Sequence, residues 1–486
     1  MFFLLCWVAW PAAASKGMGF DEARHLLGRA SFGANYATLQ EYAGLDREHA
    51  VQRLMADDGK LMRAPAWTQA AFQSSGKVAS FSEAEKKQFL RERQREGVEL
   101  RAWWLTEMRH TPAPLLEKMT LFWHNHFATS MQKVKSGQLL YRQNLTLRSH
   151  ALGNFGELLH ALAKDPAMLI YLDTVRSRRD APNENFAREV MELFTLGEGH
   201  YHEQDIREAA RAFTGWGLDR ETGEFRNYPF RHDKGEKTLF GQTGTFDGNN
   251  VINLLLARPE TAEFIVGKLW MEFVSSDKDL PENAREIKRL ARLFRQNQYE
   301  LRPLLTALLT SEAFYASNNR GTLIKSPVEL VLGVLIGLEI PTSDWRPYAF
   351  ALRDMGQDLF NPPNVKGWPG GEAWINSDSL LKRKQFLARL GRGSEMPVEE
   401  MRFRREKEAG ESDKPVAKLA EIALVRAGQR ADLAGWMRAL PGLNRRVSAR
   451  AVLLAQAPVD VDLNASQCDD VDYIVRLLQD PVYQLK

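Results

Sequence analysis

Apolar residues recur at every third or fourth position along most of the chain, which is the spacing of one buried face of an α-helix. The first such pattern begins near Asp21. The succession of these patterns predicts a mainly α fold built as one large multi-helix domain. The later predicted helices cover residues 83–109, 115–130, 138–150, 156–163, 184–196, 204–215, 249–258, 260–274, 284–297, 301–310, 326–338, 347–355, 416–428, 430–438, 444–455 and 470–480.

Three stretches interrupt the helical pattern. Residues 217–247 alternate glycine, aromatic and charged residues, which predicts a small β-hairpin or an ordered irregular excursion. Residues 361–371 contain too much proline and glycine for regular structure. Residues 391–415 are charged and interrupted by glycine and proline, so we expect a flexible insert there.

Composition excludes several classes of protein. The chain has 486 residues, with 65 Lys and Arg against 62 Asp and Glu, and 25 Phe, 12 Trp and 11 Tyr supply a large core. Collagen-like, disordered and disulfide-knot proteins are therefore excluded. The net charge of +3 argues against a nucleic-acid binder, which would show a local basic excess. Cys6 and Cys468 are too few for a disulfide framework.

Residues 1–14 are predicted to form a signal peptide. They are apolar and end in three alanines, a pattern that a signal peptidase can cut. The segment is shorter than the roughly 20 apolar residues that span a bilayer, and no later apolar stretch is long enough. Because basic residues are missing from its start, a buried helix or a misplaced start is the alternative. We expect a periplasmic or secreted protein without a stable membrane span after cleavage.

The strongest candidate for chemistry lies in the helix predicted over residues 184–196. At about 100° per residue, Glu189 falls within the arc that holds Phe186 and Val190, and Glu192 lies on the same strip as Glu189. A carboxylate among core positions is costly unless it is paired, protonated or bound to a metal. Glu189 is therefore either a functional carboxylate or half of a structural ion pair. The arginines that could form such a pair are Arg188, Arg207 and Arg211.

The second candidate is a pair of histidines in the helix predicted over residues 115–130, which is apolar on nearly every side. His124 and His126 project about 200° apart on a helix, so they cannot both bind one metal unless the helix breaks there. We expect only one imidazole to face the helix that carries Glu189. The alternative is a core histidine bonded to a backbone or carboxylate partner.

Weaker candidates lie in loops. His232 and Asp233 belong to the irregular region, and loops carry functional residues more often than their share. His200 and His202 precede a predicted helix, where helix capping is the preferred interpretation. The sequence has no Cys-x-x-Cys pair, His-Glu-x-x-His, Gly-x-Ser-x-Gly or Walker loop, so the familiar zinc proteases, serine hydrolases and P-loop enzymes are unsupported.

Several motifs, taken together and in order, resemble a bacterial family known as domain of unknown function 1800. The resemblance covers about residues 20–390 and resumes at Leu477. The matching stretches are His25–Gly33, Phe122–Phe127, Asp165–Asp173, Asn183–Gly197, Asp205–Trp216, His232–Lys237, Lys325–Glu329, Gly367–Trp368, Trp374–Asn376 and Leu477–Gln484.

The resemblance implies an exported protein that is often encoded beside a phosphatase- or sulfatase-like family, domain of unknown function 1501. It carries over no established activity. Phe194 stands where many relatives have His, and His202 stands where Thr or Ser is usual. A haem or metal site built on position 194 would be missing from this chain. Glu189 and Glu192 are therefore the preferred candidates for functional residues.

Two functions remain open after the sequence is read. The preferred one is an exported enzyme that uses general acid–base catalysis or a divalent metal. The alternative is a non-catalytic binding or assembly partner of the co-encoded phosphatase- or sulfatase-like protein, with the loop Trp368–Trp374 as its binding surface. The candidate catalytic residues are Glu189, Glu192, His126, His124, His232 and Asp233. The candidate metal ligands are His124, His126, Glu189 and Glu192.

The same features divide the chain. After the signal peptide at residues 1–14, residues 15–390 form the helical core domain that matches the family. Residues 391–415 are the charged insert, and residues 416–486 form C-terminal helices that we expect to pack on the core.

Overall fold

The computed structural model describes residues 17–56, 63–72, 78, 80–392, 431–442, 444–464 and 468–486. The predicted signal peptide, nearly all of the predicted insert and the helix predicted over residues 416–428 lie outside these residues. The predictions for those segments are therefore untested.

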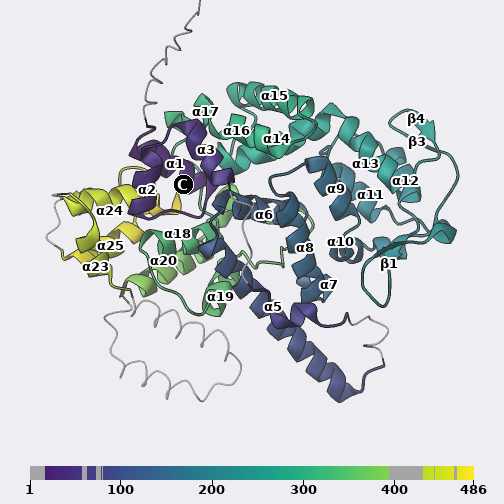
Figure 1. The fold of residues 1–486 in the computed structure, drawn as a ribbon, viewed down its shortest axis with the longest axis horizontal. Coiled ribbons are helices and arrows are strands. Elements are labelled where there is room, and N and C mark those ends of the chain that lie inside the picture. Colours follow the sequence, from purple (N-terminus) through teal and green to yellow (C-terminus); the bar gives the residue numbers. More distant parts are fainter. Residues whose placement is uncertain are drawn as a thin grey trace, which may run out of the picture.

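Helices dominate the described residues and confirm the mainly α fold (Figure 1). Most begin and end within a few residues of the predicted positions. Their bounds are α1 Phe20–Ala30, α2 Tyr36–Ala43, α3 Arg47–Met55, α5 Glu83–His110, α6 Pro114–His126, α7 Met131–Val134, α8 Gly137–His150, α9 Phe155–Ala163, α10 Pro166–Tyr171, α11 Glu184–Glu192, α12 Glu203–Ala212, α13 Gly248–Ala257, α14 Pro259–Phe273, α15 Pro281–Gln296, α16 Leu301–Leu309, α17 Glu312–Tyr315, α18 Pro327–Gly337, α19 Arg346–Asp354, α20 Ser377–Arg392, α23 Leu433–Ala439, α24 Arg445–Leu453 and α25 Asp470–Gln479.

Two predicted helices are shorter than expected. The one predicted over residues 115–130 ends at His126, and the separate short helix α7 follows after an extended link that ends at its N-cap, Ser130. Helix α11 ends at Glu192 because the next residues close a tight turn in which Gly197 adopts a φ of 80°. The backbone N–H of Gly197 donates to the carbonyl of Met191, so the chain folds back toward the end of α11.

The irregular region near residues 217–247 contains two small hairpins rather than one. Strand β1 (Trp216–Leu218) pairs antiparallel with β2 (Phe225–Asn227), and β3 (Lys237–Leu239) pairs antiparallel with β4 (Gln242–Gly244). Both lie at the edge of the helical body, the pair β3–β4 against α12 and the pair β1–β2 next to α10 (Figure 1). The alternation of aromatic and charged residues correctly predicted a β excursion in this region. The turn residues in the sequence did not show that it contains two hairpins.

Helix α6 runs through the centre of the core and packs against α1, α3, α5 and α8 (Figure 1). Trp104 and Trp123 are fully buried there. The carboxylate of Glu117 on α6, also fully buried, forms an ion pair with Arg148 of α8 and accepts a 3.0 Å hydrogen bond from Nε1 of Trp104 on α5. Because a buried charge is stable only when its partners are in place, this group links α5, α6 and α8 in one arrangement.

The C-terminal helices pack on the body of the protein, α25 against α20 and α24 against α18. The last residues lie beside residues 323–325: the N–H of Lys486 donates to the carbonyl of Leu323, and the N–H of Lys325 donates to the carbonyl of Gln484, both at 2.8 Å. These bonds bring Lys486 into the interior, near α1 (Figure 1).

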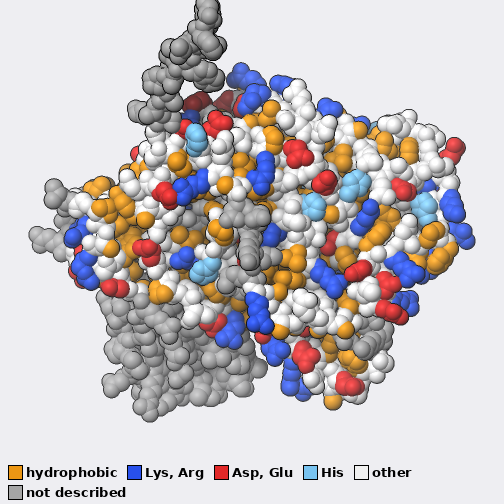
Figure 2. Space-filling model, viewed as in Figure 1, with side chains coloured by type: hydrophobic (Ala, Val, Ile, Leu, Met, Phe, Trp, Pro, Cys, Tyr) orange, Lys and Arg blue, Asp and Glu red, His pale blue; other side chains and the backbone are white. Residues whose placement is uncertain are grey.

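The surface in Figure 2 mixes acidic, basic and apolar side chains over most of the face shown. Among the described helices, none combines the length and the apolar character needed to cross a bilayer.

Candidate functional site

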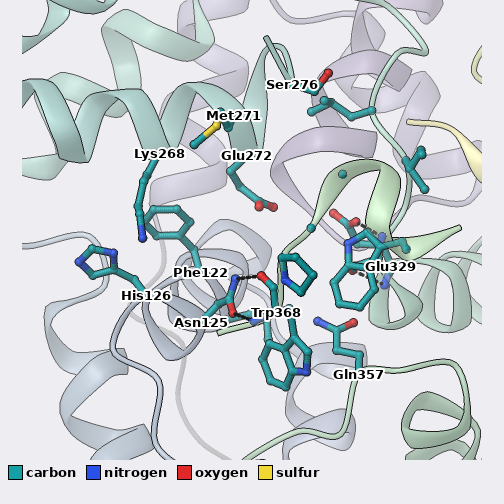
Figure 3. A pocket seen from close by; sticks show the side chains of 18 of the residues that line it. Phe122, Asn125, His126, Lys268, Met271, Glu272, Ser276, Glu329, Gln357 and Trp368 are labelled. Atoms are coloured by element: carbon teal, nitrogen blue, oxygen red, sulfur yellow. Dashed lines mark hydrogen bonds between the residues drawn. The ribbon is translucent and has the colours of Figure 1, made fainter. Parts of the chain in front are cut away.

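A cavity of about 320 Å³ lies between α6, α14, α18 and the loop 366–374 (Figure 3). This volume is at the lower end of the range for small-molecule sites. Its wall combines aromatic side chains with an unusual number of charged ones. The charged residues of the wall are Lys118, Lys268, Glu272, Glu329, Lys366 and Lys486.

One wall of the cavity is held in place by Asn125 on α6 (Figure 3). Its amide donates to the carbonyl of Trp368 at 3.2 Å, and its Oδ1 accepts from the N–H of Trp368 at 2.7 Å. Gly367 adopts a φ of 80°, and a Cβ there would lie 2.3 Å from Oδ1 of Asn125. The turn therefore needs glycine at position 367 to approach α6.

The two tryptophans of the loop Trp368–Trp374 are buried, so the binding surface predicted from the sequence is left with the exposed residues between them, Pro369 and Gly371–Ala373. Trp368 is 4% exposed and Trp374 is 8% exposed. Both side chains face inward and line the cavity, because the turn at Gly367 folds the loop onto α6.

The two histidines of α6 have different partners. Nε2 of His124 accepts a 3.1 Å hydrogen bond from the N–H of Phe360, so His124 serves the fold beside Trp104. Burial, with a smaller effect of Arg101, lowers the pKa of His124 to about 3. This ring stays neutral at physiological pH.

His126 lines the cavity and is 4% exposed. Its Nε2 lies 3.2 Å from the carbonyl of Phe194, just beyond α11. Because a carbonyl can only accept, Nε2 carries the proton and Nδ1 carries the lone pair. Nδ1 is buried and has no hydrogen-bond partner among the described residues. Burial, together with the charge of Lys268, lowers the pKa of His126 well below its usual value.

Lys268 extends from α14, and its amine points toward the imidazole of His126 (Figure 3). The amine lies 5.1 Å from the ring centre of Phe264. Within the described part of the chain, no ion pair or hydrogen bond of this amine is seen. Burial alone lowers the pKa of Lys268 to about 8.

A balanced group of charges occupies the other end of the cavity. Nζ of Lys118 contacts Glu329 closely and lies 3.1 Å from Oε1 of Glu272, while Nζ of Lys486 also contacts Glu329 and lies 3.5 Å from the same Oε1. Burial raises the pKa of Glu272, but the charges of Lys118 and Lys486 outweigh it and hold the pKa at about 2. The carboxylate still faces the cavity, since 32% of the side chain is exposed.

The structure changes the interpretation of the carboxylates on α11. Glu189 is only half-buried, so the predicted burial among core residues is wrong: its place lies at the edge of the apolar arc. Burial and the neighbouring Glu192 raise the pKa of Glu189. It has no ion pair with Arg188, which pairs instead with Glu203 at 2.7 Å, and no hydrogen bond joins it to either histidine of α6 among the described residues.

Glu192 does not line the cavity but lies next to a residue that does. It accepts a 2.9 Å hydrogen bond from the hydroxyl of Tyr201 and lies 3.9 Å from Nζ of Lys366, which lines the cavity and also lies 3.7 Å from Glu198. Glu192 is therefore connected to the cavity through Lys366.

His232 and Asp233 hold their own loop to α12. Nδ1 of His232 donates to the carbonyl of Thr214 at 2.9 Å, and Asp233 accepts a 2.7 Å hydrogen bond from Nε of Arg211. The side chain of Lys237 donates to the carbonyl of Asp233 at 2.7 Å. These contacts explain the motif structurally, and neither residue lines the cavity.

The metal site considered from the sequence does not assemble. In the ranges that the structure describes, no three His, Cys, Asp or Glu side chains are grouped so that they could hold a metal ion. His124 and His126 point to different partners, and Glu189 and Glu192 contact neither ring. The four residues therefore do not share a centre.

A family model described as "Protein of unknown function (DUF1800)" matches residues 25–485 of the chain. The chain belongs to this family. No match was found among curated proteins or among solved structures.

The first motif of this DUF1800 chain, His25–Gly33, supports helix α14, which forms one wall of the cavity. Arg29 on α1 is fully buried, and its guanidinium donates to the carbonyls of Phe273 and Val274 at 3.0 and 3.1 Å. Phe273 is the last residue of α14 and Val274 is its C-cap, where helix ends leave carbonyl acceptors without intrahelical partners. Arg29 therefore fixes the end of the helix that carries Glu272.

Lys268 and Glu272 were missed in the sequence, although a signal was present. They stand four residues apart in a helix that is otherwise mostly apolar around them, so they share one face. A lysine and a glutamate on one face are usually a surface pair. Only the fold shows that this face looks into a cavity of the DUF1800 protein.

Proposed function

We propose that the cavity is the active site of an exported enzyme that works on a small molecule by general acid–base catalysis. Lys268 is the proton donor, and Glu272 is its ionised partner. The observation that carries this proposal is a half-buried amine that faces neutral side chains at the wall of a cavity, one helical turn from a carboxylate open to the same cavity.

The pKa values suit this division of roles. Burial brings the pKa of Lys268 to about 8, which is close to the pH at which an acid–base group works best. The neighbouring lysines hold the pKa of Glu272 at about 2, so Glu272 remains a hydrogen-bond acceptor. The pKa of Lys268 falls from 10.5 to about 8 and that of Glu272 from 4.5 to about 2, so near neutral pH the site holds a proton donor close to its titration range beside an ionised acceptor.

His126 keeps the surroundings of Lys268 uncharged. Its imidazole is held neutral by burial, with Nε2 fixed by the carbonyl of Phe194. A carboxylate of the protein at this position would pair with Lys268 permanently and raise its pKa before any ligand arrived. The neutral ring leaves the lysine able to exchange a proton with a bound molecule.

Trace acetylation of the native protein with acetic anhydride tests the first step. The acetylated fraction of Lys268, measured by mass spectrometry from pH 6 to 11, should rise with a midpoint near 8, against about 10.4 for an ordinary lysine. The exposed Lys278 serves as internal reference. A midpoint for Lys268 equal to that of Lys278 contradicts the proposal.

The second step is turnover. Incubation with a mixture of small polar metabolites, followed by NMR, should reveal consumption of a compound. Lys268→Met and Glu272→Gln should each slow it by about 10²- to 10⁴-fold, the usual contribution of an acid–base group. Lys278→Met is the matched control, since it removes an exposed lysine that does not line the cavity. Equal rates in wild type and Lys268→Met contradict the proposed role.

Export is part of the proposal and rests on residues 1–14 of the sequence. Expression of the full chain in a bacterial host should yield protein in the periplasm or medium whose first residue is about Ser15. A cytoplasmic product that retains Met1 contradicts export.

One observation favours the second candidate, a docking role toward the phosphatase- or sulfatase-like protein. Phe230 is 68% exposed, and the guanidinium of Arg231 lies 5.4 Å from its ring centre. Aromatic and arginine side chains are enriched at the energetic centres of protein interfaces. If docking is the function, Phe230→Ala should reduce co-purification of that protein, whereas the exposed Val461→Ala should not.

A further inference from the structure

We infer that the cavity takes a small organic acid that also carries a hydroxyl or amino group, with its carboxylate on Lys268 and its donor group on Glu272. This inference rests on the proposed function and adds the class of substrate. It follows from the charges that line the cavity, from their spacing and from the available space.

The charges of the wall leave one cation without a partner. Glu272 and Glu329 are balanced by Lys118 and Lys486, which contact both carboxylates. Lys366 lies at the rim beside Glu192 and Glu198.

Lys268 is the charged residue of the wall for which the described residues supply no counter-ion. A desolvated cation without a counter-ion is unfavourable, and an anionic ligand removes that cost. The neutral neighbours, Phe264 and His126, cannot do so.

Glu272 supplies the second contact. Lys118 and Lys486 both make their closest approach to its Oε1, and the carboxylate projects into the cavity (Figure 3). An ionised carboxylate has lone pairs for several hydrogen bonds and accepts only. The ligand group that meets it must therefore be a donor, such as a hydroxyl or an amino group.

Spacing and volume set the size of the ligand. Residues four apart on a helix have Cβ atoms about 5–6 Å apart, so one small molecule can reach both Lys268 and Glu272. The cavity of about 320 Å³ corresponds to roughly ten water volumes, which admits a small molecule and not a polymer chain. Phe122 and Met271 provide apolar surface for the carbon skeleton.

Calorimetric titration of the purified protein with three probes tests the class. Glycolate has both groups, acetate has only the anion, and glycolamide has only the neutral groups. We expect glycolate to bind most tightly, and glycolamide to bind at least about tenfold more weakly. Lys268→Met should weaken glycolate binding by about tenfold or more. Lys278→Met should change it less than about threefold, because Lys278 is exposed and does not line the cavity.

Glu272→Gln separates the two contacts. Because glutamine offers a weaker acceptor and no charge, glycolate should fall to the affinity of acetate, while acetate binding should change little. Melting temperatures of all variants show whether each is folded. Glycolamide that binds as tightly as glycolate, or equal losses in Lys268→Met and Lys278→Met, overturns the inference. Inorganic phosphate that binds more tightly than glycolate and is insensitive to Glu272→Gln also overturns it, in favour of a phosphorylated ligand.

The two proposals fail in different ways. If Lys268 acetylates with a midpoint near 8 and turnover is found but the acids do not bind, the substrate class is wrong and the enzyme proposal stands. If the acids bind through Lys268 but no compound is consumed, the site is a binding site and the enzyme proposal is wrong.

Discussion

At one end of the cavity, two glutamates and two lysines from α6, α14, α18 and the last residue of the chain contact one another. At the other end, Lys268 faces a phenylalanine ring and a neutral imidazole. The two ends share a helix, since Glu272 and Lys268 both belong to α14. The surroundings of the two groups nevertheless differ in whether they compensate the charge. The first group satisfies its charges within the protein, and the second leaves a charge to be satisfied from outside.

This difference separates structural charges from functional ones. A buried ion pair fixes the arrangement of the elements that supply its partners, and removal of one member strands the other. An unbalanced charge costs stability and is retained where function needs it. Mutations should therefore have opposite effects on stability at the two ends of the cavity.

The largest effect is expected from breaking the balanced group. Glu329 is 4% exposed, contacts Lys118 and Lys486, and accepts a 2.7 Å hydrogen bond from the N–H of Ser326 at the start of α18. Glu329→Ala leaves two buried lysines with one carboxylate, so the free energy of unfolding in urea should fall by about 3–5 kcal/mol.

A double mutant tests whether charge is the cause. In Lys118→Met/Glu329→Gln one charge of each sign is removed, so its loss should be smaller than the sum of the two single losses by about 1 kcal/mol or more. Additive losses would show that the four charges do not act as a group.

The second prediction is a gain in stability at the other end. Folding lowers the pKa of Lys268 from 10.5 to about 8 by burial, so between these values the unfolded chain holds a proton that the folded protein has released. The charged amine therefore costs stability below about pH 8, and this cost disappears as the pH rises through that window. Lys268→Met should raise the free energy of unfolding at pH 7 by about 2–3 kcal/mol, with the difference falling toward zero near pH 10.5.

Urea titrations of both proteins at pH 7, 9 and 10.5 measure this difference. Lys278→Met, at an exposed lysine, is the control and should stay near zero throughout. A Lys268→Met protein that is less stable than wild type at pH 7 would mean that the amine has a structural partner and that the contrast between the two ends is false.

The fold could be predicted from the sequence to a large extent because helices leave a local signal. The three-to-four spacing placed α5, α8, α9 and α14 within one or two residues, and the N-caps Ser82, Ser136 and Asn154 set the starts of the first three. The errors came where the end of a helix depends on distant contacts. Helix α6 ends at His126, where Asn125 and His126 already bond to the loop at Trp368 and to the carbonyl of Phe194.

The site was less predictable for a physical reason. A periodic pattern shows which face of a helix is apolar, but it does not show whether a polar face meets solvent or a cavity. Glu189 stood out because it falls near an apolar arc, whereas Lys268 and Glu272 resembled an ordinary surface pair. His126 was found because a polar residue in a central helix is rare, yet its neighbour Lys268 comes from a helix more than a hundred residues later.

The smallest effect expected here compares two glutamates whose pKa values are shifted in opposite directions. Burial alone would raise the pKa of Glu272, but Lys118 and Lys486 lower it from 4.5 to about 2, so its contribution to stability is present above about pH 4.5 and is lost as the pH falls toward 2. Because about a third of the side chain is exposed, the full shift overstates the energy, and Glu272→Gln should cost about 1–2 kcal/mol at pH 7. For Glu189, burial and Glu192 raise the pKa, so its ionised form is unfavourable and Glu189→Gln should be neutral or slightly stabilising at pH 7.

Urea midpoints measured from pH 7 down to pH 3 distinguish the two glutamates. The difference between wild type and Glu272→Gln should shrink as the solution becomes acidic, because Glu272 in the unfolded chain becomes protonated first and the advantage of its ionised form in the folded protein is lost. The small difference between wild type and Glu189→Gln should also shrink. It has the opposite sign, because this variant is expected to be as stable as wild type or slightly more stable at pH 7. If both variants lose the same stability at pH 7, the charge at Glu272 is no better compensated than the charge at Glu189, and the lysines at that end do not balance it.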